Sequence, residues 1–427
     1  MCVVIYVVKP GDNLYEIARR YGVPYTKIVR DNELSDPSRL AVGQTLVILR
    51  GLRTHIIRPG ESIYSISRIY GIPVRDILAA NPQITSPNQL YIGQVINIPE
   101  EKKLGTIDVN GYALPGIDME VLRKALPYLS YLSIFSYEVR ADGSLKPIED
   151  EELIRAARAA RVAPIMVVSN IAEGGFSSDL ARTIFTNQQV RDTLINNIIK
   201  TMRDKNYAGL DMDFEFIYPE NKEDYNNFLR VVVKRLEDEG YNITATAVAP
   251  KESGEMQGLL YTAHDYPVHG ALVDHVIIMT YEWGYVAGPP LAVAPINEVE
   301  KIIKYAVSAI PSRKILMGIP NYGYDWTLPY TSGTRARTLS IVQANDLAIR
   351  EGAAIQYDTK SQAPFFYYFD DAGRQHVVWF EDARSIEAKL LLANQYKLGG
   401  VSYWTINKYF PQNWLVLSSM FNIRKLL

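Results

Sequence analysis

The sequence predicts an α/β protein in which a closed barrel of eight parallel strands with surrounding helices follows two copies of a small βααβ unit. Two observations predict this architecture. From about residue 106 onward, eight apolar runs of strand length alternate with amphipathic helical segments, the pattern of a (β/α)8 barrel. Ahead of that region, one stretch occurs twice with an offset of about 49 residues. A doubly wound sheet is the competing fold, but no glycine-rich phosphate loop follows any of the apolar runs.

The overall composition excludes several classes of protein. The 427 residues are 48% hydrophobic and 22% charged, with a formal net charge of -2, which is typical of globular proteins with more than one domain. This balance gives no electrostatic reason to expect nucleic acid or an anionic membrane as a partner, so we expect neither, and we expect a monomer. The single Cys2 excludes an intrachain disulfide and a multi-thiolate metal site. No run approaches the roughly 20 apolar residues of a membrane span.

The N-terminal stretch MCVVIYVVKPGD is predicted to be a strand that ends at a turn. It lacks a basic n-region, its apolar run is short, and no small-residue cleavage site follows it, so it does not match a signal peptide. No secretion route is therefore expected from this stretch.

Each copy of the repeated unit has the same internal logic. VVKPGDNLYEIARRYGVPYTKIVRDN at 7–32 recurs as IIRPGESIYSISRIYGIPVRDILAAN at 56–81. A short strand stops at Pro-Gly, and an acid that suits the helix dipole opens a helix that a glycine then ends. A second short helix and a loop lead to the returning strand. The acids are Asp12 and Glu61, the glycines are Gly22 and Gly71, and the returning strands are 45–48 and 95–98. We assign the copies to residues 1–50 and 51–99.

These copies resemble the LysM module, because GDNLYEIARRYG and GESIYSISRIYG are each followed by VGQ or IGQ before the last strand. The resemblance covers both copies nearly end to end and implies binding to N-acetylglucosamine in peptidoglycan or chitin. It places sugar contacts in the loop after the first strand and the loop before the last. The candidate residues are Gly11, Asp12, Asn13 and Asn32 in the first copy, and Gly60, Glu61, Ser62 and Asn81 in the second. For Gly11 and Gly60 we prefer the interpretation that they serve turn geometry alone.

The remaining chain, 100–427, carries the predicted barrel behind the charged linker PEEKKLG at 99–105. The strand candidates are 107–112, 132–137, 163–169, 209–214, 244–249, 275–281, 315–320 and 400–404. The main helical segments are 149–160, 188–204, 222–238, 297–309 and 381–396. The interval after the seventh strand is too long for one helix and is rich in strand-forming residues. We therefore expect a small α+β subdomain inserted at about 324–378, which walls one side of the barrel mouth.

The stretch YAGLDMDFEF (207–216) puts three acids at alternate positions of a strand that the barrel pattern buries. Because successive side chains of a strand point to opposite faces, Asp211, Asp213 and Glu215 share the face that points into the barrel. Crowding and burial raise carboxyl pKa values, so one member keeps a proton near neutral pH and can serve as a general acid. Glu215, the last of the three, should reach furthest into the mouth, where such barrels have their active sites. The alternative is a solvated edge strand, which the flanking apolar residues disfavour.

This acidic strand resembles the D-x-x-D-x-D-x-E signature of family 18 glycoside hydrolases. IIMTYEWGY (277–285) resembles the family's M-x-Y-D strand, GIPNYGYDW (318–326) its seventh strand and GGVSYWTI (399–406) its eighth. The resemblance covers most of 106–420, and with two LysM copies in front the chain is similar to spore cortex-lytic N-acetylglucosaminidases. Two positions depart from the family's pattern. Ala208 replaces the first Asp of the signature, and Glu282 replaces the Asp of M-x-Y-D.

The resemblance implies a substrate-assisted, retaining mechanism that needs no metal or organic cofactor. The acetamide oxygen of the sugar attacks its own C1. Glu215 protonates the leaving oxygen and then activates water, while Asp213 orients the acetamide and stabilises positive charge. Asp211 would share a proton with Asp213. Tyr281 would hydrogen-bond the acetamide, and Trp404 would floor the sugar pocket. The other candidates for substrate contact are Glu282, Met279, Tyr112, Phe135, Asn321 and Tyr322.

Three functions remain open. We expect first a β-N-acetylglucosaminidase acting on peptidoglycan, spore cortex or its fragments, located on the spore or in the cell wall. The second is a chitinase with the same chemistry. The third is a sugar-binding lectin on an inactive barrel, which the presence of Glu215 disfavours. The histidines of HDYPVHG (264–270) would need a third ligand nearby to hold a metal, so we interpret them as loop histidines.

Overall fold

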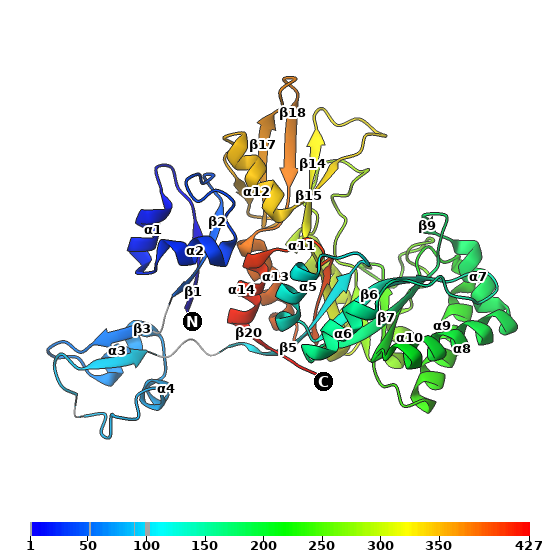
Figure 1. Cartoon of the computed structure of the whole chain (residues 1–427), viewed down its shortest axis with the longest axis horizontal. Helices are drawn as coiled ribbons and strands as arrows, with labels where there is room; N and C mark the ends of the chain where they lie inside the picture. The colour runs from blue at the N-terminus through cyan, green and yellow to red at the C-terminus, as the bar shows by residue number, and fades with distance from the viewer. Residues whose placement is uncertain (1, 51–52, 89, 99–102) are drawn as a thin grey trace.

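The computed structural model describes residues 2–50, 53–88, 90–98 and 103–427 (Figure 1). Most of the predicted linker and the side chain of Cys2 lie outside the described residues. Among the helices that are described, none combines the length and the apolar character needed to cross a bilayer.

Both N-terminal units have the predicted βααβ order, with their two strands paired antiparallel. The first unit consists of β1 (Cys2–Val7), α1 (Leu14–Tyr21), α2 (Tyr25–Asn32) and β2 (Thr45–Arg50). The second consists of β3 (Arg53–Ile56), α3 (Ile63–Tyr70), α4 (Val74–Ala79) and β4 (Val95–Ile98). Each first helix ends at a glycine in the left-handed conformation, Gly22 and Gly71, as the sequence predicts.

The start of these helices corrects one expectation. The residue that caps α1 is Asn13, whose Oδ1 accepts the backbone N–H of Glu16, and α3 is capped by Ser62. Asp12 instead accepts the backbone N–H of Lys9 at 2.8 Å and the hydroxyl of Tyr6 at 2.5 Å. Asp12 therefore closes the Pro-Gly turn. The capping position falls to the next residue, Asn13, whose side chain reaches a free N–H group of the first helical turn.

The predicted eight-stranded parallel barrel is present and closed. Its strands are β5 (Gly105–Ala113), β6 (Tyr131–Glu138), β7 (Ala163–Ser169), β10 (Gly209–Asp213), β11 (Thr244–Val248), β12 (His275–Ile278), β13 (Ile315–Pro320) and β19 (Gly400–Trp404). They pair in chain order, and β19 pairs with β5 to close the ring. An additional short strand that the sequence did not predict, β20 (Phe421–Ile423), pairs with the start of β5.

Strand β12 is three residues shorter than predicted, and this matters for the mouth of the barrel. After Ile278 the backbone turns, so that the N–H of Tyr281 bonds the carbonyl of Met279 rather than a neighbouring strand. Glu282 then has a φ of +70°, in the left-handed region. The four positions of the M-x-Y-D motif, 279–282, therefore lie in the mouth loop that follows β12.

Helices surround the barrel. They are α5 (Met119–Ala125), α6 (Glu151–Ala159), α7 (Ser178–Thr186), α8 (Gln188–Lys205), α9 (Lys222–Asp238), α10 (Tyr266–Leu272), α11 (Ile296–Ala309), α13 (Ala383–Gln395) and α14 (Pro411–Met420). The five predicted helical segments are confirmed to within two residues at each end. The sequence did not predict α5, α7, α10 and α14, which are short or, in α10 and α14, begin with proline at the first turn.

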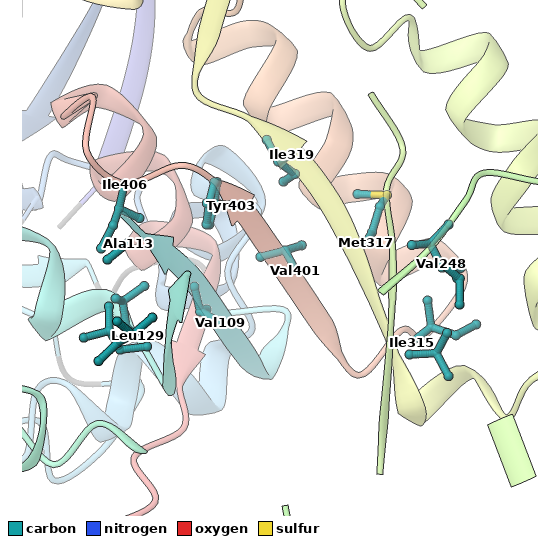
Figure 2. Close-up of a cluster of buried hydrophobic side chains, with 14 of the residues drawn as sticks. Val109, Ala113, Leu129, Val248, Ile315, Met317, Ile319, Val401, Tyr403 and Ile406 are labelled. Carbon is teal, nitrogen blue, oxygen red and sulfur yellow. The ribbon is translucent and has the colours of Figure 1, made fainter. Parts of the chain in front are cut away.

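The alternation of side chains divides the barrel into an outer core and a lumen. Figure 2 shows Ile315, Met317 and Ile319 of β13 on one face of that strand, and Val401 and Tyr403 of β19 alongside them. These residues belong to the core between strands and helices. The residues between them on the chain face inward, and the lumen is filled by Val167, Ala245, Ile277 and Leu316 beneath an aromatic layer.

The predicted insertion is confirmed as an α+β subdomain that stands at one side of the barrel mouth (Figure 1). It contains β14 (Tyr322–Thr327), β15 (Arg337–Ser340), α12 (Ile341–Arg350), β16 (Gln356–Asp358), β17 (Ala363–Phe369) and β18 (Gln375–Trp379). The strands form one antiparallel sheet in the order β15-β14-β18-β17-β16. A small hairpin of β8 (Ile171–Ala172) and β9 (Gly175–Phe176) follows β7 at the mouth.

Candidate active site

A cavity of about 580 Å³ opens at the carboxyl ends of the barrel strands. Eight residues that the sequence analysis singled out line it together: Tyr112, Phe135, Asp213, Glu215, Met279, Tyr281, Glu282 and Trp404. The hairpin β8–β9 contributes Ile171 and Phe176, and the loop after β11 contributes Met256 and Tyr261. Carboxylates below aromatic and apolar walls give a site that suits a sugar, because sugar rings present both apolar faces and hydroxyl groups.

Strand β10 positions the acids as the alternation predicts. Leu210, Met212 and Phe214 are fully buried in the core under the helices, whereas Asp211 and Asp213 are buried on the lumen side. Glu215 follows two residues after the strand and lines the cavity. The strand begins at a glycine for a steric reason, because a Cβ on Gly209 would lie 2.3 Å from the carbonyl oxygen of Ile243.

One side chain fixes the backbone of Glu215. Asn170, directly after β7, accepts the Glu215 N–H through Oδ1 at 2.9 Å and donates from Nδ2 to the Glu215 carbonyl at 2.8 Å. Asn170 is itself fully buried. This residue was not predicted from the sequence, although a polar residue at the carboxyl end of a barrel strand was a usable signal.

His264 holds the preceding residue. Its Nδ1 accepts the N–H of Ala249 at 2.8 Å, so Nε2 carries the hydrogen that is donated to the Phe214 carbonyl at 3.0 Å. His264 and His269 are both buried, and burial lowers the pKa of His264 to about 4 and that of His269 to about 3. The interpretation as a loop histidine is confirmed for His264, which precedes α10, and is wrong for His269, which lies in α10.

Burial is the main electrostatic influence on the three acids. It raises the pKa of Glu215 to about 7. It also raises the pKa of Asp213 well above its usual value, with the negative charges of Glu215 and Asp211 adding to the effect. Burial raises the pKa of Asp211 to about 6, and a hydrogen bond from Tyr112 opposes that rise. A protonated carboxyl next to ionisable neighbours at neutral pH is the expected state of a general acid.

The hydrogen bonds of the acids differ from the predicted sharing of a proton between Asp211 and Asp213. The hydroxyl of Tyr112 donates to Oδ2 of Asp211 at 2.5 Å. Within the described residues we find no hydrogen bond between the two aspartates, and Oδ1 of each has no protein partner. Asp213 is among the residues that line the cavity, but its unpaired Oδ1 is itself buried.

Three aromatic rings form one wall of the site. Trp404 packs edge-to-face against Tyr112 and Phe135, with ring centroids 5.3 and 4.9 Å apart. Trp404 is only partly buried because it also borders the cavity. Its position at the end of β19 leaves an aromatic surface available for stacking on a sugar ring.

Tyr281 depends on a glycine that the sequence analysis did not consider. A Cβ on Gly318, in β13, would lie 2.8 Å from the ring atom Cε1 of Tyr281 and 2.6 Å from the Ile278 carbonyl oxygen. The ring therefore occupies space that only a glycine leaves open. Burial, together with the charges of Asp213 and Glu215, raises the pKa of Tyr281 well above its usual value, so the hydroxyl remains a hydrogen-bond donor.

Glu282 connects the cavity to the inserted subdomain. Its Oε1 accepts the hydroxyls of Tyr322 and, at 2.9 Å, Tyr324. Glu282 is exposed at the mouth, but partial desolvation by its neighbours raises the pKa of its carboxyl group, and these two hydrogen bonds oppose the rise. Tyr324 was missed, although it follows Tyr322 at strand spacing and so shares its face.

Two predicted contact residues do not border the cavity. Asn321 is buried and uses its N–H to bond the Trp404 carbonyl at 3.0 Å. Tyr322 is also buried and reaches the site only through Glu282. Both lie at the point where the chain leaves β13 for β14. The Asn321 side chain donates to the Thr405 carbonyl at 3.4 Å, and the Tyr322 hydroxyl donates to Glu282.

A second groove, of about 250 Å³, lies in the first N-terminal unit. Its lining residues are Asp12, Asn13, Leu14, Tyr15, Tyr25, Pro37, Ser38 and Leu40. The predicted candidates Asp12 and Asn13 therefore border it. Gly11 has a φ of +82°, as does Gly60, which supports the turn interpretation for both.

Asn32 and Asn81 do not fit the role of sugar ligands. Both side chains are buried and are occupied in holding the returning strand: Asn32 bonds the N–H and carbonyl of Val47, and Asn81 bonds those of Asn97. This burial contradicts a direct sugar contact. Glu61 accepts the Arg58 N–H and pairs with His55 at 2.7 Å, so it closes its turn as Asp12 does.

Among the described residues, no group of three or more His, Cys, Asp and Glu side chains is arranged to hold a metal ion.

Comparisons with known sequences match the chain to two families. The sequence model of glycosyl hydrolases family 18 matches residues 124–408, and the LysM domain model matches residues 6–49 and 55–99. The chain is 43% identical over 428 residues to a cortical fragment-lytic enzyme of Bacillus subtilis (strain 168), covering 99% of each chain.

Solved structures give the same result. The crystal structure of the spore cortex-lytic enzyme SleL of Bacillus megaterium QM B1551 superposes with a TM-score of 0.89 and 42% identity, over 99% of both chains. A chitinase from Chromobacterium violaceum ATCC 12472 superposes with a TM-score of 0.69 and 26% identity, over 74% of this chain and 98% of the other. The chain belongs to family 18 of the glycosyl hydrolases, and it carries two LysM domains ahead of the hydrolase barrel.

Proposed function

We propose that this glycoside hydrolase cleaves spore cortex peptidoglycan or its fragments at the β-1,4 bond that follows N-acetylglucosamine. The observation that carries the proposal is the partly buried Glu215, whose pKa is raised to about 7, beside Asp213 in a cavity of sugar size. The full-length similarity to a cortical fragment-lytic enzyme and to a spore cortex-lytic enzyme supports the choice of polymer.

The proposed reaction begins with attack by the substrate on itself. The acetamide oxygen of the N-acetylglucosamine residue forms a bond to C1 while the bond from C1 to the leaving oxygen breaks. Glu215 gives its proton to that leaving oxygen. The carboxyl group of Asp213, on the cavity wall, stabilises the positive charge that develops on the new ring through the hydrogen bond that it accepts from the acetamide N–H. Water then attacks C1 and transfers a proton to Glu215 while the bond from C1 to the acetamide oxygen breaks. This step restores both the acetamide and the acid, with retained configuration.

The other residues bind and orient the sugar in this proposal. Asp213, on the cavity wall, accepts the acetamide N–H through its carboxyl group. Tyr281 donates its hydroxyl to the acetamide oxygen, and Trp404 stacks on the sugar ring. Met279 adds an apolar surface to the same wall of the cavity.

We further propose that the protein acts as a monomer at the spore cortex or cell wall, with no membrane partner. The LysM domains bind the glycan polymer and thereby convert the encounter of barrel and substrate into an intramolecular event, which raises the effective concentration of cleavage sites.

Chitin is the second candidate substrate, and one observation favours it: the similarity to the Chromobacterium violaceum chitinase. We rank it lower because that likeness covers 74% of this chain, whereas the cortex-lytic relatives match over the whole chain, LysM domains included. An inactive lectin ranks last, because the general acid candidate Glu215 is in place and its pKa suits the role.

The decisive experiment incubates the protein with cortex fragments and with chitin oligomers side by side and analyses the products by mass spectrometry. We expect fragments from cortex with N-acetylglucosamine at the new reducing end, and the β-anomer as the first product by NMR. The Glu215→Gln variant should bind both polymers normally and lose nearly all turnover. Faster cleavage of chitin, or full activity in the variant, would contradict the proposal.

A further inference from the structure

The two LysM domains differ in what their sheets face. In β2 of the first domain, Leu46 and Ile48 pack into the domain's own core, whereas Val47 between them is buried in the core of the barrel domain. In β4 of the second domain, Ile96 and Ile98 likewise form the domain's own core, but the position of Val47 is taken by Asn97. Apolar residues on both faces of a strand indicate burial on both faces.

The turn before the last strand makes the closest contact. The N–H of Ile355 donates to the carbonyl of Val42 at 2.8 Å, and a Cβ on Gly43 would lie 1.8 Å from the Ile355 carbonyl oxygen. In the second domain this turn is Tyr91–Gly93 instead, where Tyr91 and Ile92 are 72% and 71% exposed. Gly93 has the same backbone conformation as Gly43, with φ values of +85° and +84°, yet open space beyond it.

Hydrogen bonds between buried polar groups join the first domain to α14. Gln412, which is buried, donates from Nε2 to Oδ1 of Asn32 at 3.0 Å and to the carbonyl of Thr45 at 2.7 Å. Its Oε1 accepts the Thr45 hydroxyl at 2.9 Å. A buried amide with all of these partners satisfied specifies one arrangement, because any other leaves polar groups unpaired. In the described part of the second domain we find no hydrogen bond to the barrel domain.

We infer that the first LysM domain is a fixed part of the hydrolase and that the second alone moves as a glycan anchor. Figure 1 shows the first domain beside α14 and the second standing apart. The groove of the first domain is lined only by its own residues, so it stays open in the docked state. A glycan bound there lies at a constant position relative to the cavity. The nature of that glycan rests on the proposed function, but the docking does not.

Distance measurements between spin labels test this inference without any assay of activity. In a Cys2→Ser background, one full-length protein carries labels at Tyr15→Cys and Glu237→Cys, and another at Tyr64→Cys and Glu237→Cys. Tyr15 and Tyr64 are equivalent, exposed positions of the two domains. We expect a single narrow distance distribution from the first domain to the barrel and a broad one from the second. Broad distributions for both, or narrow ones for both, overturn the inference.

Two matched pairs of variants locate the contact. Gly43→Ala and Gly93→Ala impose the same backbone strain, but only Gly43→Ala places a methyl group against Ile355. We expect Gly43→Ala to broaden the first distribution and to speed amide exchange in 411–420 by about tenfold or more, and Gly93→Ala to change neither. If Gly43→Ala unfolds its own domain, Val47→Asn replaces it, because Val47 does not belong to that domain's own core. We expect Val47→Asn to broaden the distance distribution of the first domain, and Asn97→Val is its control. If the two variants of each pair have the same distance distributions and the same amide exchange rates, the inference is overturned.

Discussion

A single side chain, Asn170, holds the backbone of Glu215 from both sides, accepting its N–H at 2.9 Å and donating to its carbonyl at 2.8 Å. The residue that the proposed reaction needs most therefore lies after its strand has ended, where no sheet hydrogen bond could fix it. Together with the bond from His264 to the Phe214 carbonyl, this contact decides where the carboxyl group points.

Loss of the Asn170 side chain should therefore act on catalysis by displacing Glu215. We predict that Asn170→Ala lowers kcat by about 10- to 100-fold with a smaller change in KM, because a misplaced acid harms the transition state more than binding. The alkaline limb of the pH profile should also move to lower pH as Glu215 becomes less buried. Asn197→Ala, which removes a comparable bond to the Gly143 carbonyl, is the control. An unmoved pH profile would assign Asn170 a purely structural role.

The pH dependence of activity follows from the raised pKa of Glu215. The proposed first step needs the protonated acid, so on the alkaline side of the profile activity is lost as the pH rises through about 7. We predict that kcat falls about tenfold per pH unit on the alkaline side. Steady-state kinetics on soluble cortex fragments from pH 5 to 9 measure this limb. A profile that stays flat up to pH 9 contradicts the assignment of the acid.

The same pKa has an opposite consequence for stability. A carboxyl whose pKa is raised by folding favours the folded state in its neutral form, so its contribution is present below its unfolded pKa and lost as the pH rises through about 7. Glutamine mimics the neutral form at every pH. We predict that Glu215→Gln raises the free energy of unfolding at pH 8 by on the order of 2–3 kcal/mol, and has little effect near pH 4. Urea titrations at both pH values measure it, with the exposed Glu237→Gln as control.

Tyr112 is expected to tune the aspartate pair. Its hydrogen bond to Asp211 lowers the pKa of that carboxyl, so Tyr112→Phe should raise it and shift the acidic limb of the activity profile to higher pH. We predict a loss of about tenfold in kcat at neutral pH as the negative charge of the pair is reduced. Phe135→Leu alters the same aromatic wall without touching the hydrogen bond. If both variants show the same pH profile, the hydroxyl has no such role.

The departure at Glu282 gives a prediction about substrate binding. Aspartate is shorter by one methylene and would lose reach to the Tyr322 and Tyr324 hydroxyls. We predict that Glu282→Asp raises KM several-fold with a smaller change in kcat, because the residue borders the cavity without belonging to the reacting acids. Tyr324→Phe should produce a weaker form of the same effect. A variant that loses kcat at constant KM would place Glu282 in the chemistry itself.

Several features of this protein were determined by the sequence alone. The repeat at 7–32 and 56–81 fixed two βααβ units, and the apolar runs fixed eight barrel strands and the insertion. The alternation in YAGLDMDFEF put Asp211, Asp213 and Glu215 on one side of β10. These conclusions are secure from sequence because they depend on period and spacing, which are local properties of the chain.

The tertiary structure alone decided which side chains complete the site. Asn170 lies 45 residues from Glu215, and Tyr112 lies 99 residues from Asp211, so neither pairing has a local pattern. Three other features also depend on contacts between distant parts of the chain. They are the burial of Asn32 and Asn81, the position of Asn321 away from the cavity, and the docking of the first LysM domain. Periodicity determines which face a side chain takes within its own element, whereas its hydrogen-bond partner depends on how distant elements pack, and that is set only when the whole barrel closes.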